Sequence, residues 1–92
     1  AYYLKKYDKL EKLTAFRRGR LQVQDVSSML AAEAAAPGEG SLILDLCAAP
    51  GGKSLYLADL AGEGSLVIAR DLTPGKVQLI RENADRCGAG QV

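Results

Sequence analysis

Two short apolar runs, each followed by an acidic residue, constrain the fold of this chain more than any other feature. The first run is Leu42 to Leu44, which ends at Asp45, and the second is Leu66 to Ala69, which is followed closely by Asp71. A segment of small residues, Cys47 to Gly52, lies between them and leads into a stretch that favours a helix. Two nearly continuous apolar strands joined by a helix are typical of a parallel pair with both faces covered and a right-handed crossover. The sequence therefore predicts an α/β fold.

Three helices are expected around these strands. The first is Met29 to Ala36, which a proline and a glycine follow, and the second is Ser54 to Leu60. A third is expected after Thr73. Threonine is a favourable N-cap residue, and Pro74 at the first helical position is a second start signal. Residues that favour helix N-caps precede the first helix: Asp25, Ser27 and Ser28. The third helix has one apolar face, made by Val77, Ile80, Ala84 and Cys87.

The first twenty residues are strongly basic. They hold seven Lys or Arg residues against two acidic ones, a net charge of +5, whereas the remaining 72 residues hold five basic and nine acidic residues, a net charge of −4. This distribution favours a polyanionic partner such as a nucleic acid, but a solvated surface without a partner fits the same charges. Helical spacing runs through Tyr3, Tyr7, Leu10 and Leu13. Ala1 to Lys6 is equally compatible with a strand, and Leu21 to Val23 alternates like a brief extended segment.

The length of 92 residues allows at most one small domain, and two features indicate a piece of a longer protein. The only methionine is internal, at Met29, and the sequence stops at Val92, shortly after the helix-stop glycine Gly88. A βαβα unit normally continues into a further strand at this point. We therefore expect the sheet to be truncated after the second helix of that unit.

Composition excludes several kinds of site. The chain has no histidine, so it holds neither a His-containing zinc site nor a His general base. Cys47 and Cys87 form neither a metal-binding spacing nor a disulfide framework, and no metal site is expected. No apolar run approaches the roughly 20 residues that a membrane span needs, and no secretory signal is present. These features predict no contact with a membrane and a reducing, cytoplasmic location.

Three classes of ligand compete for the small-residue loop. A dinucleotide site requires G-x-G-x-x-G, which is absent. A phosphate-binding P-loop requires G-x-x-x-x-G-K-[ST], and Cys47 to Ser54 matches it except at the first glycine; however, Pro50 offers no backbone amide to a phosphate. S-adenosylmethionine carries a carboxylate and ribose hydroxyls, which suit a loop at a helix N-terminus and an acid after the next strand, here Asp71. S-adenosylmethionine is the favoured cofactor, and a P-loop-like nucleotide binder remains an alternative.

Three groups of motifs follow one another along the chain. Upstream stand Phe16-x-x-Gly19, Val23-Gln24-Asp25 and Ser27-Ser28; in the middle stands D-L-C-A-A-P-G-G-K, Asp45 to Lys53; downstream stand Ala69-Arg70-Asp71 and Glu82-Asn83-Ala84. Together they resemble the Nop/Sun (Sun/Fmu) family of RNA cytosine-5 methyltransferases, in particular its bacterial ribosomal RNA branch. The resemblance implies a partial Rossmann-like class I methyltransferase fold. It divides the chain into a basic lead-in, residues 1–24, and the N-terminal part of the S-adenosylmethionine-binding domain, residues 25–92.

The same resemblance implies the residues of the cofactor site. Asp71 would hold the ribose, while Asp45 either caps the turn or contacts the ligand. Lys53 is expected to contribute to the site, although a solvated lysine fits the same position. The residues expected to line the cofactor, besides Asp71, are Cys47, Ala48, Ala49, Pro50, Gly51, Gly52 and Lys53.

Methylation of cytosine C5 requires a nucleophile, because attack of a thiolate at C6 turns the ring into an enolate-like system that accepts the methyl group. The resemblance implies that the parent protein methylates RNA, most specifically 16S ribosomal RNA, with a cysteine from motifs that this sequence does not contain. Cys47 lies within the cofactor loop and Cys87 on the apolar face of a helix, so neither is expected to be catalytic. The 92 residues alone are expected to be inactive. A non-catalytic RNA-binding relic is the second alternative.

Overall fold

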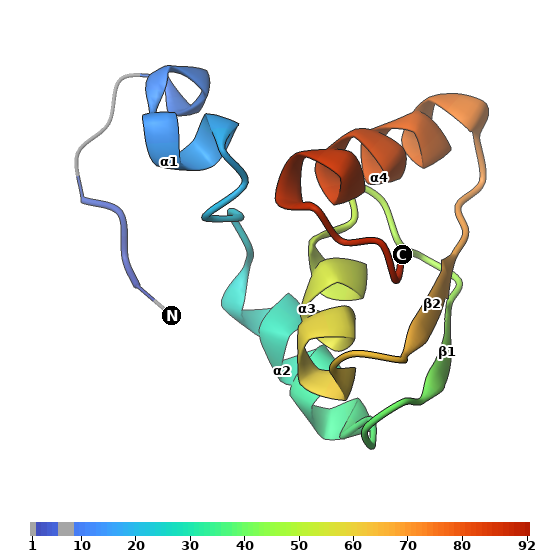
Figure 1. The fold of residues 1–92 in the computed structure, drawn as a ribbon. Helices are drawn as coiled ribbons and strands as arrows, with labels where there is room; N and C mark the ends of the chain where they lie inside the picture. Colours follow the sequence, from blue (N-terminus) through green and yellow to red (C-terminus); the bar gives the residue numbers. More distant parts are fainter. Residues whose placement is uncertain (1, 6–8) are drawn as a thin grey trace.

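The strands expected from the two apolar runs form a parallel pair. The computed structural model describes residues 2–5 and 9–92, in which β1 is Leu42–Asp45 and β2 is Leu66–Ala69. The strands are paired with Leu42 opposite Leu66 and Asp45 opposite Ala69. Both strands therefore end at the same edge of the sheet, and the residues that follow them lie next to each other (Figure 1).

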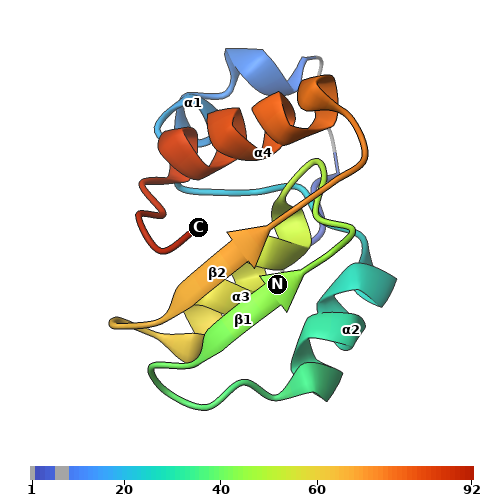
Figure 2. The same cartoon turned by 90° about the vertical axis from the view of Figure 1, so that its right-hand side faces the viewer.

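The crossover between the strands is α3, Gly52–Ala61, which packs against one face of the sheet (Figure 2). Val67 of β2 is also buried. The helix α2, Val26–Ala35, packs on α3 and buries Ala32. The buried apolar side chains of α3 are Leu55, Leu57, Ala58 and Ala61. This helix supplies more of the buried apolar side chains than any other element, and the α/β fold class is confirmed.

The opposite face of the sheet remains largely open. Leu42 is 72% exposed, Leu44 57% and Ile68 45%. The expectation that both faces are covered is therefore wrong for the described residues, because α3 occupies one face and α2 packs on α3 instead of on the sheet. At the edge of β2, the N–H of Val67 donates to the carbonyl of Gln91 at 2.8 Å, so the last described residues lie along this strand.

The third helix, α4, spans Pro74–Cys87 and lies beyond the carboxyl ends of the strands (Figure 2). Its limits are those that the sequence predicts. The side chain of Thr73 accepts a hydrogen bond from the N–H of Lys76 at 3.3 Å, and Gly88 ends the helix in the left-handed conformation with φ 66°. Ile80 and Ala84 are buried on its apolar face, which places this helix over the loop that follows β1.

The lead-in is less regular than its spacing predicts. Its described helical parts are the 3-10 turn η1, Leu10–Lys12, and the one-turn helix α1, Thr14–Arg17. Neither residues 2–5 nor residues 21–23 form a strand, and a continuous helix from Tyr3 does not form. Leu13 has an extended backbone (φ −76°, ψ 122°) and separates η1 from α1, so the two short helical elements do not join into one helix. Ala1, Lys6 and Tyr7, which those predictions included, lie outside the described residues.

The helix α2 starts earlier than the sequence predicts, at Val26. Asp25 occupies the N-cap position with an extended backbone, as expected of a cap. Its carboxylate, however, accepts a hydrogen bond from the hydroxyl of Ser27 and none from a backbone N–H of the helix. The serines therefore lie inside the first turn, which lengthens the helix at its start.

We expect Ala36→Gly to stabilise the chain by about 0.5–1 kcal/mol, because Ala36 ends α2 with φ 44° and ψ 57°. This left-handed conformation costs a residue with a Cβ about 1–2 kcal/mol, which exceeds the chain entropy that glycine adds. Urea unfolding measures the difference. The matched control is Ala34→Gly inside the same helix, which should destabilise the chain by about 1 kcal/mol. Equal signs for the two changes would contradict the expectation.

Candidate cofactor site

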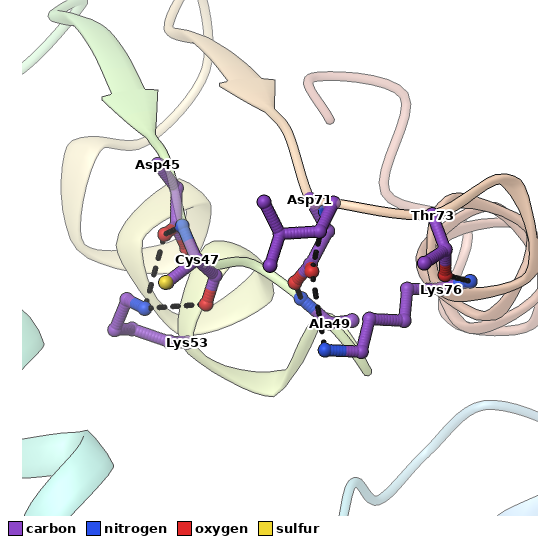
Figure 3. A network of polar contacts seen from close by, with 8 residues as sticks. Asp45, Cys47, Ala49, Lys53, Asp71, Thr73 and Lys76 are labelled. Atoms are coloured by element: carbon purple, nitrogen blue, oxygen red, sulfur yellow. Dashed lines mark hydrogen bonds and ion pairs between the residues drawn. The ribbon is translucent and has the colours of Figure 1, made fainter.

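The first anchor of the small-residue loop is Asp45, the last residue of β1 (Figure 3). It is 4% exposed. Its Oδ1 accepts the N–H of Cys47 at 3.2 Å and forms an ion pair with Nζ of Lys53 at 3.0 Å. Its Oδ2 accepts the hydroxyl of Ser54 at 2.7 Å, and Ser54 is completely buried. All three partners belong to the loop or to the first turn of α3, so Asp45 holds the loop against the helix.

The second anchor is Asp71, which follows β2 (Figure 3). Its Oδ2 accepts the N–H of Ala49 at 3.0 Å, across 22 residues of sequence. Its Oδ1 accepts the N–H of Leu72 at 2.7 Å and lies 3.5 Å from Nζ of Lys76. The carboxylate therefore joins the end of the second strand to the middle of the loop.

Hydrogen bonds to the charged carboxylate favour its ionised form. The N–H groups of Leu72 and Ala49 hold the pKa of Asp71 below its usual value, and the ammonium of Lys76 acts in the same direction. Asp71 therefore stays a carboxylate, able to accept hydrogen bonds, throughout the neutral range. Its Oδ2 accepts a single hydrogen bond from the described residues, and a carboxylate oxygen can accept a second.

This lowered pKa predicts how stability depends on pH. Because the unfolded chain binds the proton more readily than the folded one, Asp71 stabilises the fold above about pH 4, and this contribution disappears as the pH falls through the lower folded pKa. Asp71→Asn should therefore be less stable than the parent chain at neutral pH, and the gap should narrow on acidification. Urea midpoints of both chains at a series of pH values measure it. The control for the removal of a carboxylate is Glu63→Gln, in an exposed turn. A difference in urea midpoint between Asp71→Asn and the parent chain that does not change with pH would contradict the prediction.

Backbone contacts fix the rest of the loop. The N–H of Ala48 donates to the carbonyl of Arg70 at 3.1 Å, which extends the pairing of the strands by one step. Nζ of Lys53 donates to the carbonyl of Cys47 at 3.1 Å. Pro50, which follows a cis peptide bond, accepts a hydrogen bond at its carbonyl from Nδ2 of Asn83 at 2.8 Å. The loop is thus held from β1, β2, α3 and α4 at once.

The N-terminus of α3 keeps free hydrogen-bond donors. Gly51 occupies the N-cap position with φ 112° and provides no side-chain cap. In the part of the chain that the structure describes, no acceptor reaches the backbone N–H groups of Gly52 and Lys53. Such groups, at the positive end of a helix dipole, are suited to a carboxylate or another anion.

The structure brings together all the residues that the sequence assigns to the cofactor, because the loop and Asp71 share one edge of the sheet. It does not enclose them. The structure has two open hollows in this region. One, of 260 Å³, lies between the lead-in, α2 and α3, and Gly52 at the end of the loop lines it. The other, of 270 Å³, lies between β2 and α4, and Ala69 and Ile80 line it. The assigned roles of the site residues stay predictions.

Two other expectations concern what the chain lacks. Within residues 2–5 and 9–92, no group of three or more His, Cys, Asp or Glu side chains could hold a metal ion. Over the same residues, no helix has the length and apolarity needed to cross a membrane. Cys47 is exposed and Cys87 half-buried, and both are free thiols.

The comparison with known families decides the family. A family model described as "16S rRNA methyltransferase RsmB/F" matches residues 32–92, which include the loop, both strands and α4. The chain belongs to this family. The resemblance read from the sequence motifs is therefore confirmed.

Curated relatives of this chain agree with its assignment to the RsmB/F family. The "Probable ribosomal RNA small subunit methyltransferase B" of Bacillus subtilis is 48% identical over 73 residues, which are 79% of this chain and 16% of that protein. The "tRNA (cytosine(72)-C(5))-methyltransferase" of Pyrococcus horikoshii is 34% identical over 87 residues, 95% of this chain and 22% of that protein. The chain thus spans less than a quarter of the length of these relatives.

A solved structure has the same fold as this chain over most of its length. The crystal structure of NSun6 from Pyrococcus horikoshii with SFG superposes with a TM-score of 0.85 and 34% sequence identity. The match covers 94% of this chain and 22% of that one. The similarity therefore extends to the lead-in as well as to the strands and helices.

Sequence reasoning missed two residues of this region. Asn83 lies in the motif Glu82-Asn83-Ala84, which by itself indicates no role for it, and no motif of the sequence includes Arg86. Both contact the segments around the loop, as Asn83 binds the carbonyl of Pro50 and Arg86 binds the lead-in. Their spacing of three on one helix is the signal that could have found them, since such residues lie on the same face.

Proposed function

We propose that this chain is the S-adenosylmethionine-binding part of an RNA cytosine-5 methyltransferase that acts on small-subunit ribosomal RNA. The proposal is supported by membership of the RsmB/F family. The observation that carries it is the loop itself: the carboxylates of Asp45 and Asp71 fix it at the carboxyl edge of a parallel sheet, in front of the N-terminus of α3. Ligands of open α/β sheets bind at this edge.

Each end of the cofactor has a suitable partner. Its amino-acid carboxylate would meet the free N–H groups of Gly52 and Lys53, and its ribose hydroxyls would donate to Asp71, which keeps room for a further hydrogen bond. The small side chains of the loop let the cofactor approach the backbone closely. The other lining residues in this proposal are Cys47, Ala48, Ala49, Pro50 and Gly51.

The bound cofactor would supply an electrophilic methyl group, and this chain would bind and orient it. Neither cysteine is placed to attack a cytosine in this proposal: Cys47 is part of the loop, where its carbonyl accepts Nζ of Lys53, and Cys87 is half-buried at the end of α4. The nucleophile would come from another part of the parent protein. We therefore expect the 92-residue chain to bind cofactor weakly at best and to transfer no methyl group.

Calorimetry with S-adenosylmethionine, S-adenosylhomocysteine and ATP tests this function. We expect both S-adenosyl compounds to bind and Asp71→Ala to weaken them at least 10-fold, while Glu63→Ala in the turn after α3 leaves them unchanged. Binding of ATP alone would replace the proposal with a P-loop-like nucleotide site. Binding of none of the three would favour a non-catalytic relic.

The basic lead-in is the proposed contact with RNA. The side chains of Arg17, Arg18 and Arg20 are exposed on and after α1, which leaves their guanidinium groups available to phosphates. A ribosomal RNA substrate would place the parent protein in the cytoplasm, where ribosomes assemble.

Replacing Arg17, Arg18 and Arg20 together by Ala should flatten the salt dependence of RNA binding. Each lost phosphate contact lowers the slope of log K against log salt by about 0.7 on single-stranded RNA, so the triple change should lower it by about 2. Fluorescence titrations of a labelled RNA at several salt concentrations measure the slope. Arg81→Ala, an exposed arginine on α4, is the control that should change the slope little. An unchanged slope in the triple variant would reject the lead-in as the phosphate contact.

A further inference from the structure

A chain of side-chain contacts connects the lead-in with the cofactor loop through α4. At the loop end, Nδ2 of Asn83 donates to the carbonyl of Pro50 at 2.8 Å. At the other side of the same amide, Oδ1 of Asn83 accepts Nη2 of Arg86 at 3.2 Å. Because a guanidinium has no acceptor, the amide oxygen must face Arg86 and the amide nitrogen must face Pro50. Arg86 therefore fixes the orientation in which Asn83 holds the loop.

Arg86 is held in turn by the lead-in. Its Nη1 donates to the carbonyls of Phe16 at 2.8 Å and of Leu21 at 3.0 Å, and its Nη2 donates to the side chain of Gln22. Its guanidinium carbon lies 3.8 Å from the centre of the Phe16 ring, which adds a cation–π contact. These partners are 64 to 70 residues away in sequence. The lead-in thus determines where the guanidinium lies.

The backbone of the lead-in also touches α4 directly. Gly19 has φ 69°, and a Cβ built there would lie 1.9 Å from the carbonyl oxygen of Arg86. The glycine is required for this close approach, because no residue with a side chain fits it. Two independent observations, the arginine contacts and the glycine approach, therefore place the lead-in firmly on the end of α4.

We propose that Asn83 and Arg86 are positioning residues, through which docking of the lead-in sets the loop for cofactor binding. The proposal rests on the proposed function and goes beyond it, because neither side chain contacts Asp71 or the free N–H groups of α3 in the structure. Asn83 and the two aspartates hold the loop at different points: Cys47 by Asp45, Ala49 by Asp71 and Pro50 by Asn83. Loss of the contact between Asn83 and Pro50 leaves the end of the loop, next to Gly51 and Gly52, free to move.

The test measures cofactor affinity well below the melting temperature of each variant, and far-UV circular dichroism first establishes that each variant is folded. Asn83→Asp removes the N–H donor to the carbonyl of Pro50 and keeps an acceptor for Arg86. Arg86→Lys keeps the positive charge and loses the planar guanidinium, whose two terminal nitrogens donate to the lead-in and to Asn83. Each should raise the Kd for S-adenosylmethionine about 3- to 10-fold, as expected for the loss of one or two hydrogen bonds. Gln78→Ala, an exposed amide on the same helix, is the matched control and should leave the Kd unchanged.

Coupling between the two ends distinguishes positioning from a general loss of stability. Gly19→Ala, which displaces the lead-in, should raise the Kd as much as Asn83→Asp does, and the double variant should be no weaker than either single one. Fully additive effects, or a Kd within twofold of the parent chain in both Asn83→Asp and Arg86→Lys, would overturn the proposal.

A readout without cofactor separates this proposal from the proposed function. Amide hydrogen exchange at Ala49 and Leu55, whose N–H groups donate to Asp71 and to the carbonyl of Gly51, should be faster in Asn83→Asp than in the parent chain, and unchanged in Gln78→Ala. If the parent chain binds no S-adenosylmethionine but this acceleration appears, the proposed function fails and the positioning of the loop stands. If exchange is unaffected, the positioning role fails whatever the chain binds.

Discussion

Gly19→Ala should destabilise the chain by about 2–5 kcal/mol, the larger part of what a domain of this size possesses. The new Cβ would lie 1.9 Å from the carbonyl oxygen of Arg86, and φ at this position is 69°. Left-handed backbone costs a residue with a side chain about 1–2 kcal/mol, and forcing the neighbour away costs about 1–3 kcal/mol more. Urea unfolding gives the total.

The structure also predicts where the damage of Gly19→Ala lies. The lead-in should separate from α4, which exposes the peptide bonds after Arg17, Arg18 and Arg20 to trypsin. The matched control is Gly75→Ala in α4, where a Cβ meets nothing within 4 Å. It should stabilise the chain by about 0.5–1 kcal/mol, because alanine favours the helix. A stability within about 0.5 kcal/mol of the parent, together with unchanged cleavage, would show that the close approach of Gly19 is not required.

Asp45→Ala should cost about 2–4 kcal/mol and release the small-residue loop, Cys47 to Gly52. The change deprives the buried hydroxyl of Ser54 and the N–H of Cys47 of their acceptor and leaves Lys53 without its ion pair. A buried donor without an acceptor costs about 1–3 kcal/mol, whereas the half-exposed ammonium regains water and adds little. Urea unfolding and hydrogen exchange at the loop measure the two effects.

Two comparisons make the Asp45 prediction specific. Asp45→Asn keeps the shape and one acceptor oxygen, so it should cost about half as much as the alanine. Asp85→Ala makes the same chemical change on the exposed side of α4 and should alter stability by less than about 0.5 kcal/mol. An Asp45→Ala chain as stable as Asp85→Ala would mean that the loop does not depend on this carboxylate.

Local sequence patterns predicted the elements well wherever a short-range signal exists. The apolar runs predicted β1 and β2, and Thr73 with Pro74 predicted the start of α4. These signals depend on residues within a few positions of one another, which is the range over which caps and strand alternation act. The lead-in had a weaker signal, and the short elements η1 and α1 form there in place of the continuous helix.

The sequence predicted less well which faces of the sheet are covered and which side chains contact each other. The continuous apolar strands predicted two covered faces, but Leu42 and Ile68 remain exposed on the outer one among the described residues. A strand pattern records which side chains are apolar and contains no information on which helix will pack on them. In the same way, Asp45 could be placed at a strand end but not assigned its three partners.

By itself, the sequence determined the α/β class, the order of strand, loop and helix, and the membership of the RsmB/F family, because all three depend on neighbouring residues or on short motifs. Only the tertiary structure decided that Asp71 holds Ala49 and that Arg86 holds the lead-in. These contacts join residues 22 and 70 positions apart, and they form only after the crossover and α4 bring the segments together. Such proximity is a property of packing, which no local pattern encodes.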